Sequence, residues 1–411
     1  MSTNSDIDQR AKNTGAHGLS SAQLTVYSGY QKHPTGNFRI PKGYSVDNKH
    51  KVITRQAPQN SIVGSSFLNG SETQFKIDKN LISVLTHAYI QVKITNSTGG
   101  TTTLSPIQSC IDRIEILGTA SNVLASITGQ QLMLSNLFLH RVEFDQLFSY
   151  LGFADVSYST AGDAITNGTS VIHYIPLFHL FSAAKLHLAG LKSECFVRVL
   201  MQNSTFTLVG GTHPTITDVN LILKGFNEPR AISDSRNQVY NDVKLPIRKP
   251  FLNWIVNKDV QTLAVSTQYS STLSSIKGII AGLLVVFRPT ALTAANQSTY
   301  QAVTSLDVQL ASGESLLGYY VRLHDDYKIE AAEMFPNLLT VNKNIYAISF
   351  SEDMVGDYIS GQNNGYNVFT GNEKLVFTTN GSITPGTFNI EVHALTHEHL
   401  LINKGQITSQ K

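Results

Sequence analysis

The sequence predicts an all-β protein made of two tandem eight-stranded antiparallel jelly-roll sandwiches with short connecting helices. Composition is the first reason: apolar residues make up 41% and charged residues 15% of the chain, and Thr, Ser, Asn and Gly are abundant. That balance favours strands joined by many turns over long charged helices. The second reason is the alternation of apolar and polar residues. The third is that the order of predicted elements recurs on both sides of a polar joint at 225–250.

Alternating segments mark the strands of the first half. In 88–96 the apolar residues at alternate positions share one face, while Gln91 and Lys93 share the other, as in a half-buried strand. The same reasoning predicts strands at 110–118, 122–128, 171–177, 194–202 and 215–226. Near-helical spacing of Leu and Phe predicts one or two helices within 130–151, and an amphipathic pattern predicts a short helix at 178–191.

The second half repeats this order after the joint. Strands are predicted at 251–260, 275–288, 305–310, 344–350, 373–379, 388–395 and 399–402, with a turn between the last two. A helix is predicted within 316–334, and a short polar helix or turn at 351–360. The apolar run 278–287 is about half as long as a membrane-spanning helix, so it is interpreted as a buried strand.

Short identities between the halves support a duplicated domain. The clearest match, at a constant offset, is between Gly129-Gln-Gln-Leu-Met, ending in Leu139-His140, and Gly313-Glu-Ser-Leu-Leu, ending in Leu323-His324. Two more follow in the same order, Glu194-Cys-Phe-Val197 with Glu373-Lys-Leu-Val376, and Thr212-His-Pro-Thr with Thr384-Pro-Gly-Thr. Their shared order indicates one domain written twice.

These observations divide the chain into five parts. The predicted parts are a partly disordered N-terminal arm at 1–57, a first jelly roll at 58–227, a linker at 228–242, a second jelly roll at 243–405 and a C-terminal tail at 406–411.

The end of the arm is basic. Between Tyr30 and Arg55 one acid, Asp47, stands against six cations, with aromatic residues interleaved; the cations are Lys32, Arg39, Lys42, Lys49, Lys51 and Arg55. Such a segment suits phosphates or anionic lipid headgroups. The alternative is an extended arm that packs on a neighbouring subunit and leaves its cations in water.

The sequence carries no signature of an enzyme. It contains no P-loop, no Rossmann glycine motif, no G-x-S-x-G, no H-E-x-x-H and no C-x-x-C. This absence predicts a non-enzymatic protein with no cofactor. Cys110 and Cys195 are expected to be buried thiols rather than a disulfide. The polar segment 1–18 lacks the apolar stretch of a signal peptide, so we expect synthesis in a reducing compartment without secretion.

Two groups of residues are weak candidates for metal binding. Glu391, His393, His397 and His399 have the same parity, so one extended strand would place them on one face, where they could hold zinc. The predicted turn at 395–399 argues instead for ordinary surface histidines. The acids Asp325, Asp326, Glu330 and Glu333 lack the spacing of a calcium loop and are expected to form a solvated face. No metal site is therefore predicted.

The chain resembles the double jelly-roll major capsid proteins of tailless membrane-containing phages, adenoviruses, large nucleocytoplasmic DNA viruses, virophages and polinton-like viruses. The resemblance covers about 58–405. It is carried by Ile111-Asp-Arg-Ile-Glu-Ile-Leu-Gly, by the run 171–202, and by the ending 388–405, in which Val392, Ala394, Leu400, Ile402 and Gly405 match the family's final strand.

The resemblance implies a structural protein of the virion. In the family, a homotrimer whose six jelly rolls imitate a hexamer tiles an icosahedral shell around a DNA genome. The implied partners are further copies of the chain, neighbouring trimers, and penton and minor capsid proteins. The basic arm would lie on the inner face, near the genome or an internal membrane, and assembly would take place inside the host cell.

Three other classes remain open from the residues. A lectin-like or adhesin-like protein with two β-sandwiches fits the Thr and Asn content and the Asn-x-Ser/Thr triplets, although glycan binding uses aromatic platforms and Trp254 is the only tryptophan. An enzyme on a β-sandwich, such as a glycoside hydrolase, needs a pair of carboxylates in a cleft. A capsid protein with a single jelly roll and a projecting domain predicts unlike halves and a strongly basic arm.

Overall fold

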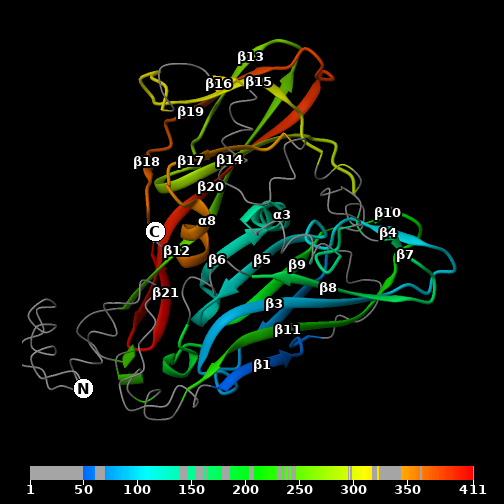
Figure 1. Cartoon of the computed structure of the whole chain (residues 1–411), viewed down its shortest axis with the longest axis vertical. Coiled ribbons are helices and arrows are strands. Elements are labelled where there is room, and N and C mark those ends of the chain that lie inside the picture. Colours follow the sequence, from blue (N-terminus) through cyan, green and yellow to red (C-terminus); the bar gives the residue numbers. More distant parts are fainter. Residues whose placement is uncertain are drawn as a thin grey trace, which may run out of the picture.

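A computed structural model of the chain describes residues 50–60, 70–138, 147, 149–153, 162, 164–177, 186–202, 208–228, 234, 237–238, 240–241, 247–294, 296, 299–316, 322–323, 344–361 and 363–410. Two β-sandwiches follow one another along the chain (Figure 1). We call the strands β1 to β11 the first roll and the strands β12 to β21 the second roll.

The first roll consists of two facing antiparallel sheets and a small third one. One sheet has the order β1 (His50–Gln56), β11 (Thr215–Asn227), β3 (Val84–Thr95) and β8 (Ser170–Pro176). The facing sheet has the order β2 (Glu72–Lys76), β9 (Phe196–Met201), β5 (Ile111–Leu117) and β6 (Val123–Thr128). The small sheet joins β10 (Leu208–Gly210), β4 (Thr102–Leu104) and β7 (Ala164–Ile165).

The second roll repeats this plan. Its larger sheet has the order β12 (Ile247–Leu263), β20 (Gly386–Asn403), β14 (Gly278–Pro289) and β17 (Tyr346–Ser349), and β18 (Asn367–Phe369) and β21 (Gln406–Gln410) pair with β14 and β20. The facing sheet has the order β13 (Gln268–Thr272), β19 (Lys374–Thr379), β15 (Val303–Gln309) and β16 (Arg322–Leu323). The predicted fold of two tandem antiparallel jelly rolls is confirmed.

The apolar run in β14 explains how the rolls are joined. Leu283, Val285 and Phe287 belong to the core between the two sheets of the second roll. Leu284 and Val286, on the opposite face of the same strand, belong to the core of the first roll. Because both faces are buried, the strand is apolar at almost every position and shows no alternation. The two rolls therefore share one continuous core where they meet.

The helices are shorter than predicted. Within 130–151 the structure has α3 (Gly129–Ser135) and the 3₁₀ turn η4 (Asn136–Phe138), and 139–146 lies outside the described residues. A capping box at Thr128 and Gln131 begins α3. The predicted helix at 178–191 is described only at its end, as the 3₁₀ turn η5 (Leu188–Gly190). The short helix predicted at 351–360 is confirmed as α8 (Met354–Ser360), which begins at the N-cap Asp353. The helix predicted within 316–334 falls mostly outside the described residues.

Three predicted boundaries are wrong. The turn expected at 395–399 is absent, because β20 continues from Gly386 to Asn403 and pairs with β12 from Gly386 to Ile402. Residues His50–Gln56, assigned to the arm, form β1 and pair with β11. Residues Gln406–Gln410, assigned to the tail, form β21 and pair with β20. The linker at 228–242 stays a prediction. Among the described residues, no helix is long and apolar enough to cross a membrane.

Candidate functional site

The junction between the rolls is built on the face of β20 that points to the first roll. Ile390, Val392 and Ala394 point into the second roll's own core, so Glu391 and His393, at the positions between them, point the other way. Their Cα partners are Val286 and Leu284 on β14, and Lys258 and Val256 on β12. Sheet pairing thus gathers charged residues from three strands at the junction.

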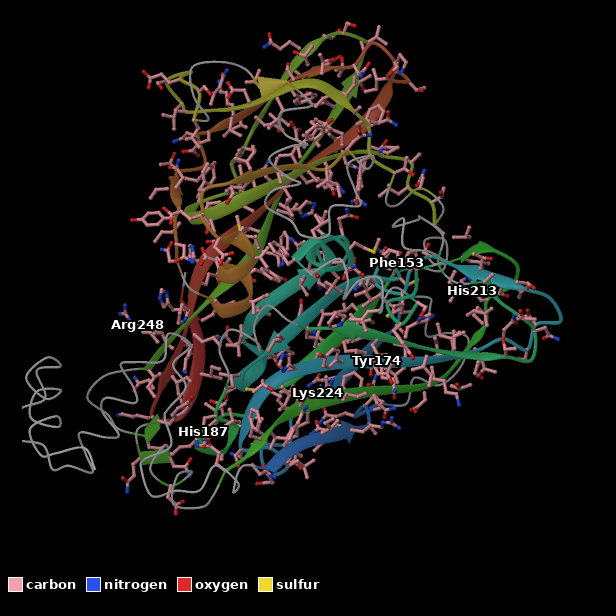
Figure 2. All side chains as sticks on the ribbon, viewed as in Figure 1. Phe153, Tyr174, His187, His213, Lys224 and Arg248 are labelled. Atoms are coloured by element: carbon pink, nitrogen blue, oxygen red, sulfur yellow. The ribbon has the colours of Figure 1, made fainter. Side chains whose placement is uncertain are left out.

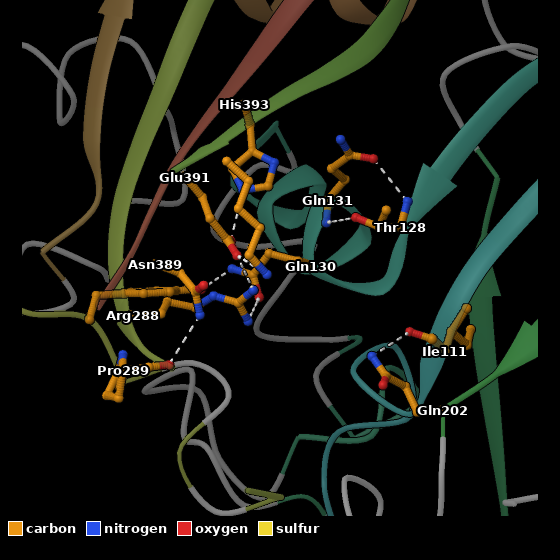
Figure 3. A network of polar contacts seen from close by, with 12 residues as sticks. Ile111, Thr128, Gln130, Gln131, Gln202, Arg288, Pro289, Asn389, Glu391 and His393 are labelled. Carbon is orange, nitrogen blue, oxygen red and sulfur yellow. Dashed lines mark hydrogen bonds and ion pairs between the residues drawn. The ribbon is translucent and has the colours of Figure 1, made fainter. Parts of the chain in front are cut away.

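A polar network crosses the junction (Figure 3). The Arg288 Nη2 donates to Glu391 Oε1 at 2.5 Å, and Lys258 Nζ lies 3.6 Å from the same oxygen. The Arg288 Nη1 donates to Oε1 of Gln130 at 3.2 Å, and Gln130 Nε2 donates to the hydroxyl of Tyr300 at 2.5 Å. Gln130 lies on α3 of the first roll, so the network links both rolls through side chains.

The surroundings of Glu391 keep it charged. Its side chain is 3% exposed, and the imidazole Nε2 of His393 lies 3.4 Å from Oε2. Burial acts to raise the pKa of Glu391, but contact with His393 and the charge of Arg288 outweigh it and lower the pKa from 4.5 to about 2. A buried carboxylate that stays ionised can hold the Arg288 guanidinium in place, and the same guanidinium donates to Gln130 of the first roll. The carboxylate is poorly suited to general acid–base catalysis, which needs a pKa near the working pH.

We expect the contribution of Glu391 to stability to vanish in acid. A carboxyl group whose pKa is lower in the folded than in the unfolded protein stabilises the folded state at pH values above its unfolded-state pKa. That stabilisation is lost as the pH falls through the folded-state pKa. The difference in free energy of unfolding between wild type and Glu391→Gln should be constant above about pH 5 and should shrink between pH 4.5 and about 2. Urea unfolding of both proteins at a series of pH values measures this. A difference that stays unchanged down to pH 3 would contradict the assignment.

Aromatic side chains fix the angle between the rolls beside this network. Phe138 of η4 stacks on Tyr358 of α8, with ring centroids 4.1 Å apart and planes inclined by 11°. Trp254 on β12 meets both rings edge-on and donates from Nε1 to the hydroxyl of Tyr358 at 3.3 Å. Trp254 is therefore part of the buried junction rather than an exposed platform for a glycan.

The C-terminal hairpin holds the rolls together at the other end of β20. Lys192 N–H donates to the carbonyl of Gly405 at 2.8 Å, and Ile407 N–H donates to Ser193 Oγ at 3.2 Å. Gly405 has φ 76°, a left-handed turn conformation that favours glycine. The side chain of Ile407 is buried in the first roll's core. The last strand of the second roll thus contributes to the first.

Replacing Ile407 should therefore destabilise the protein although it lies near the chain end. Ile407→Ala removes buried apolar volume and is expected to lower the free energy of unfolding by about 2 to 4 kcal/mol in urea titrations. The matched control is Val265→Ala, because Val265 is 46% exposed and its truncation should cost less than about 0.5 kcal/mol. Equal, small effects for the two variants would show that the hairpin is dispensable.

The four zinc candidates do not form a metal site. Glu391, His393, His397 and His399 do lie on one strand, as the zinc hypothesis required, but in the described part of the chain no three His, Cys, Asp or Glu side chains are grouped so that they could hold a metal ion. The alternative of plain surface histidines is also wrong for His393 and His397, which are buried. Burial lowers the pKa of His397. The acids Asp325, Asp326, Glu330 and Glu333 lie outside the described residues.

The two cysteines and part of the basic arm lie among the described residues. Cys110 and Cys195 are free and buried, as predicted, and burial raises the pKa of each thiol to about 12. Of the basic arm, Lys32, Arg39, Lys42 and Lys49 lie outside the described residues. Lys51 and Arg55 lie on β1, where both are exposed on the outward side of the sheet. The role of the arm stays a prediction.

A second surface, which the sequence did not reveal, lies on the outward face of the sheet β1-β11-β3-β8. We call it the open face. It contains a hollow of about 500 Å³, lined by Ile53, Tyr89, Leu147, Tyr150, Leu151, Tyr174, Pro176, Ile222 and Lys224. Tyr174 and Lys224 are labelled on this sheet in Figure 2. The sequence did contain a sign of this surface: Tyr and Ile occupy outward positions of these strands, where the alternating pattern of a half-buried strand predicts polar residues.

Side-chain contacts hold the rings of the open face in place. Lys224 Nζ lies over the ring of Tyr89, 4.5 Å from its centroid. Gln91 Nε2 donates to the hydroxyl of Tyr174 at 2.8 Å, and Tyr150 meets Tyr174 edge-on with centroids 6.0 Å apart. Contacts within the chain therefore position the rings of Tyr89, Tyr150 and Tyr174.

The sheets and their junction define the chain as a double jelly-roll protein. No protein-family model and no curated protein matches its sequence. Solved structures do match. The PBCV-1 virus capsid aligns with a TM-score of 0.69 at 14% identity, over 91% of this chain and 98% of that one. The Faustovirus major capsid protein aligns with a TM-score of 0.63 at 10% identity, over 97% and 98%.

A third solved structure also matches. The major capsid protein of Sulfolobus Turreted Icosahedral Virus aligns with a TM-score of 0.52 at 11% identity, over 84% of this chain and 96% of that one. These structural neighbours are viral capsid proteins, and they share the whole fold with this chain rather than one sandwich of it. The resemblance to the double jelly-roll major capsid proteins is thus confirmed at the level of the fold.

Proposed function

We propose that the protein is the major capsid protein of an icosahedral DNA virus, with a structural and non-enzymatic role in the virion. The observation that carries the proposal is the double jelly roll itself, shared with viral capsid proteins over most of both chains. The junction supports it, because a shell subunit has to keep a fixed shape and here the two rolls share a core, a hydrogen bond between Arg288 and Gln130, and an aromatic stack.

The assembly unit that we propose is a homotrimer. Two rolls of the same plan, held at a fixed angle, give six similar units when three copies surround a threefold axis, and so imitate a hexamer. Closed symmetry of this kind limits the assembly to a defined unit instead of an open filament. Neighbouring trimers, and penton and minor capsid proteins, would complete the shell.

The basic arm has a proposed place in this assembly. Lys32, Arg39, Lys42, Lys49, Lys51 and Arg55 would face the interior, near the genome or an internal membrane. The exposure of Lys51 and Arg55 on β1 is compatible with this position.

The native mass of the purified protein tests the proposal. Light scattering should give about three times 45.0 kDa, and negative-stain images of the same peak should show hexagonal outlines. A clean monomer at all concentrations would overturn the capsid proposal and would favour the alternative of a two-domain β-sandwich binding protein, for which a glycan screen is the next measurement.

A further inference from the structure

Asn-Gly pairs are a class of site that the proposed function does not use. The chain contains Asn69-Gly70, Asn167-Gly168, Asn364-Gly365 and Asn380-Gly381, of which Asn69 lies outside the described residues. In such a pair the backbone nitrogen of the glycine can attack the side-chain Cγ of the asparagine, because the two atoms are close along the chain and glycine has no Cβ to obstruct the approach. Whether a pair reacts depends on how the fold holds the nitrogen and the amide.

The fold holds Asn380 in an arrangement that favours this attack. Its Oδ1 accepts hydrogen bonds from the backbone N–H of Ser382 at 2.9 Å and from the Ser382 hydroxyl at 3.0 Å. Negative charge develops on this oxygen when a nucleophile adds to Cγ, and two donors on the oxygen stabilise that charge as an oxyanion hole does. In the described structure the N–H of Gly381 donates to no protein group, so its nitrogen is available as the nucleophile.

The turn that carries this arrangement is fixed at both ends. It connects β19 to β20, and the N–H of Ile383 closes it by donating to the carbonyl of Asn380 at 3.2 Å. Thr379 and Ile383, on either side of the turn, are buried, whereas Gly381 and Ser382 are exposed. The donors are therefore held in place while water reaches the reacting atoms.

The pair Asn167-Gly168 lacks a free nucleophile. The N–H of Gly168 donates to the carbonyl of Asn96 at 2.7 Å, so the nitrogen that would attack is engaged in a short hydrogen bond. The Oδ1 of Asn167 accepts one N–H, from Gly99, at 3.0 Å. This pair is therefore expected to react more slowly than Asn380-Gly381.

The pair Asn364-Gly365 has the wrong charge beside it. The Nδ2 of Asn364 donates to Oδ1 of Asp357 at 2.6 Å, and its backbone N–H donates to Oδ2 of the same carboxylate at 3.1 Å. A buried carboxylate next to the amide opposes the development of further negative charge there. The N–H of Gly365 also donates to Oδ1 of Asn363 at 3.3 Å.

We propose that Asn380 is a site of spontaneous deamidation, at which the folded chain converts an amide into a carboxylate with water as the only co-reactant. The Gly381 nitrogen bonds to Cγ and gives its proton to solvent base, and the Cγ–Nδ2 bond then breaks and releases ammonia. Water opens the resulting succinimide ring at either carbonyl, which gives aspartate or isoaspartate. The exchange of ammonia for water removes one unit from the formal net charge of +2. The step uses only groups of this turn and does not depend on the proposed capsid role.

Peptide mapping by mass spectrometry measures the step at the three described pairs in one sample. The purified full-length protein is kept folded at mildly alkaline pH, where solvent base is more abundant, and is sampled over time. We expect aspartate and isoaspartate to accumulate at position 380 at least about tenfold faster than at 167 or 364. In urea we expect the three rates to converge, because each asparagine then precedes a glycine in an unfolded chain.

Two variants separate the contributions of the donor and of the nucleophile. Ser382→Ala removes one donor to Oδ1 and keeps the backbone donor, so it should slow conversion at position 380 by about tenfold or more. Gly381→Ala places a Cβ beside the attacking nitrogen and should also slow conversion. This Cβ would lie 3.5 Å from Oγ of Ser266, an ordinary contact, so the variant should fold. Circular dichroism and thermal unfolding check that both variants are folded.

Two results would overturn the inference. Equal rates at positions 167, 364 and 380 in the folded protein would show that the fold does not select Asn380. A folded Ser382→Ala protein that converts as fast as wild type would show that the hydroxyl does not activate the amide.

Discussion

Glu391→Ala should lower the free energy of unfolding by about 3 to 5 kcal/mol, because it breaks a buried ion pair by removing one partner. The side chains of Glu391 and Arg288 are 3% and 10% exposed, so removing the carboxylate leaves a buried guanidinium without its counter-charge. Chemical denaturation near pH 7, followed by circular dichroism, measures the loss.

Two controls separate the lost charge from general damage. Replacing both partners, Arg288→Met with Glu391→Leu, should recover most of the stability, because an apolar pair of similar volume often replaces a buried ion pair without cost. Glu194→Ala breaks the surface pair with Lys76, whose side chains are 45% and 52% exposed, and should cost no more than about 1 kcal/mol. If Glu391→Ala cost as little as Glu194→Ala, the junction would not depend on the ion pair.

Gly129→Ala should be almost as damaging, at about 3 kcal/mol, for a steric reason. A Cβ on Gly129 would lie 2.2 Å from the carbonyl oxygen of Ile111 and 2.6 Å from that of Gln108. Both neighbours are backbone, so the start of α3 or the adjoining part of β5 has to move. Thermal unfolding, with a fall in melting temperature, measures the effect.

Gly100→Ala is the matched control, because nothing lies within 4 Å of a Cβ at Gly100. It should stay within about 1 kcal/mol of wild type. A small effect at both positions would mean that the α3–β5 contact is loose, and that the junction it supports is not rigid.

Gly129 also shows how far the short sequence identities between the two halves reflect their structures. Gly129 and Gly313 match in the aligned sequence, yet Gly129 is required by backbone contact, whereas Gly313 has φ 90° and open space around it. Identical residues at matching positions of the two halves therefore do not have the same structural role. The likeness of the two rolls lies in the common order of strands in their larger sheets rather than in these short identities.

The strands were predictable because their signal is local. In 88–96 and 215–226 the alternation of apolar and polar residues reproduces which side chains enter the core, and the structure has β3 and β11 there. The run 278–287, too short for a membrane-spanning helix, was also correctly interpreted as a buried strand, and the structure has β14 there.

The junction could not be predicted in the same way. His393 and His397 were interpreted as surface residues near a turn because exposed histidines are common at the end of a strand. The structure buries both histidines, because β20 continues through the expected turn and other parts of the chain cover their side chains. The hairpin at Gln406–Gln410 was taken for a tail because a short polar segment at a chain end gives no sign that a neighbouring roll will hold it.

By itself, the sequence determined the fold class, the positions of most strands and which side chains point inward. These features depend on the alternation of apolar and polar residues, which can be read from neighbouring positions in the chain. Only the tertiary structure decided which outward faces are covered and which remain open. That choice depends on contacts between residues far apart, such as Gln130 and Arg288, which are separated by 158 positions. No local pattern records such a contact, because it arises only when two finished sandwiches pack together.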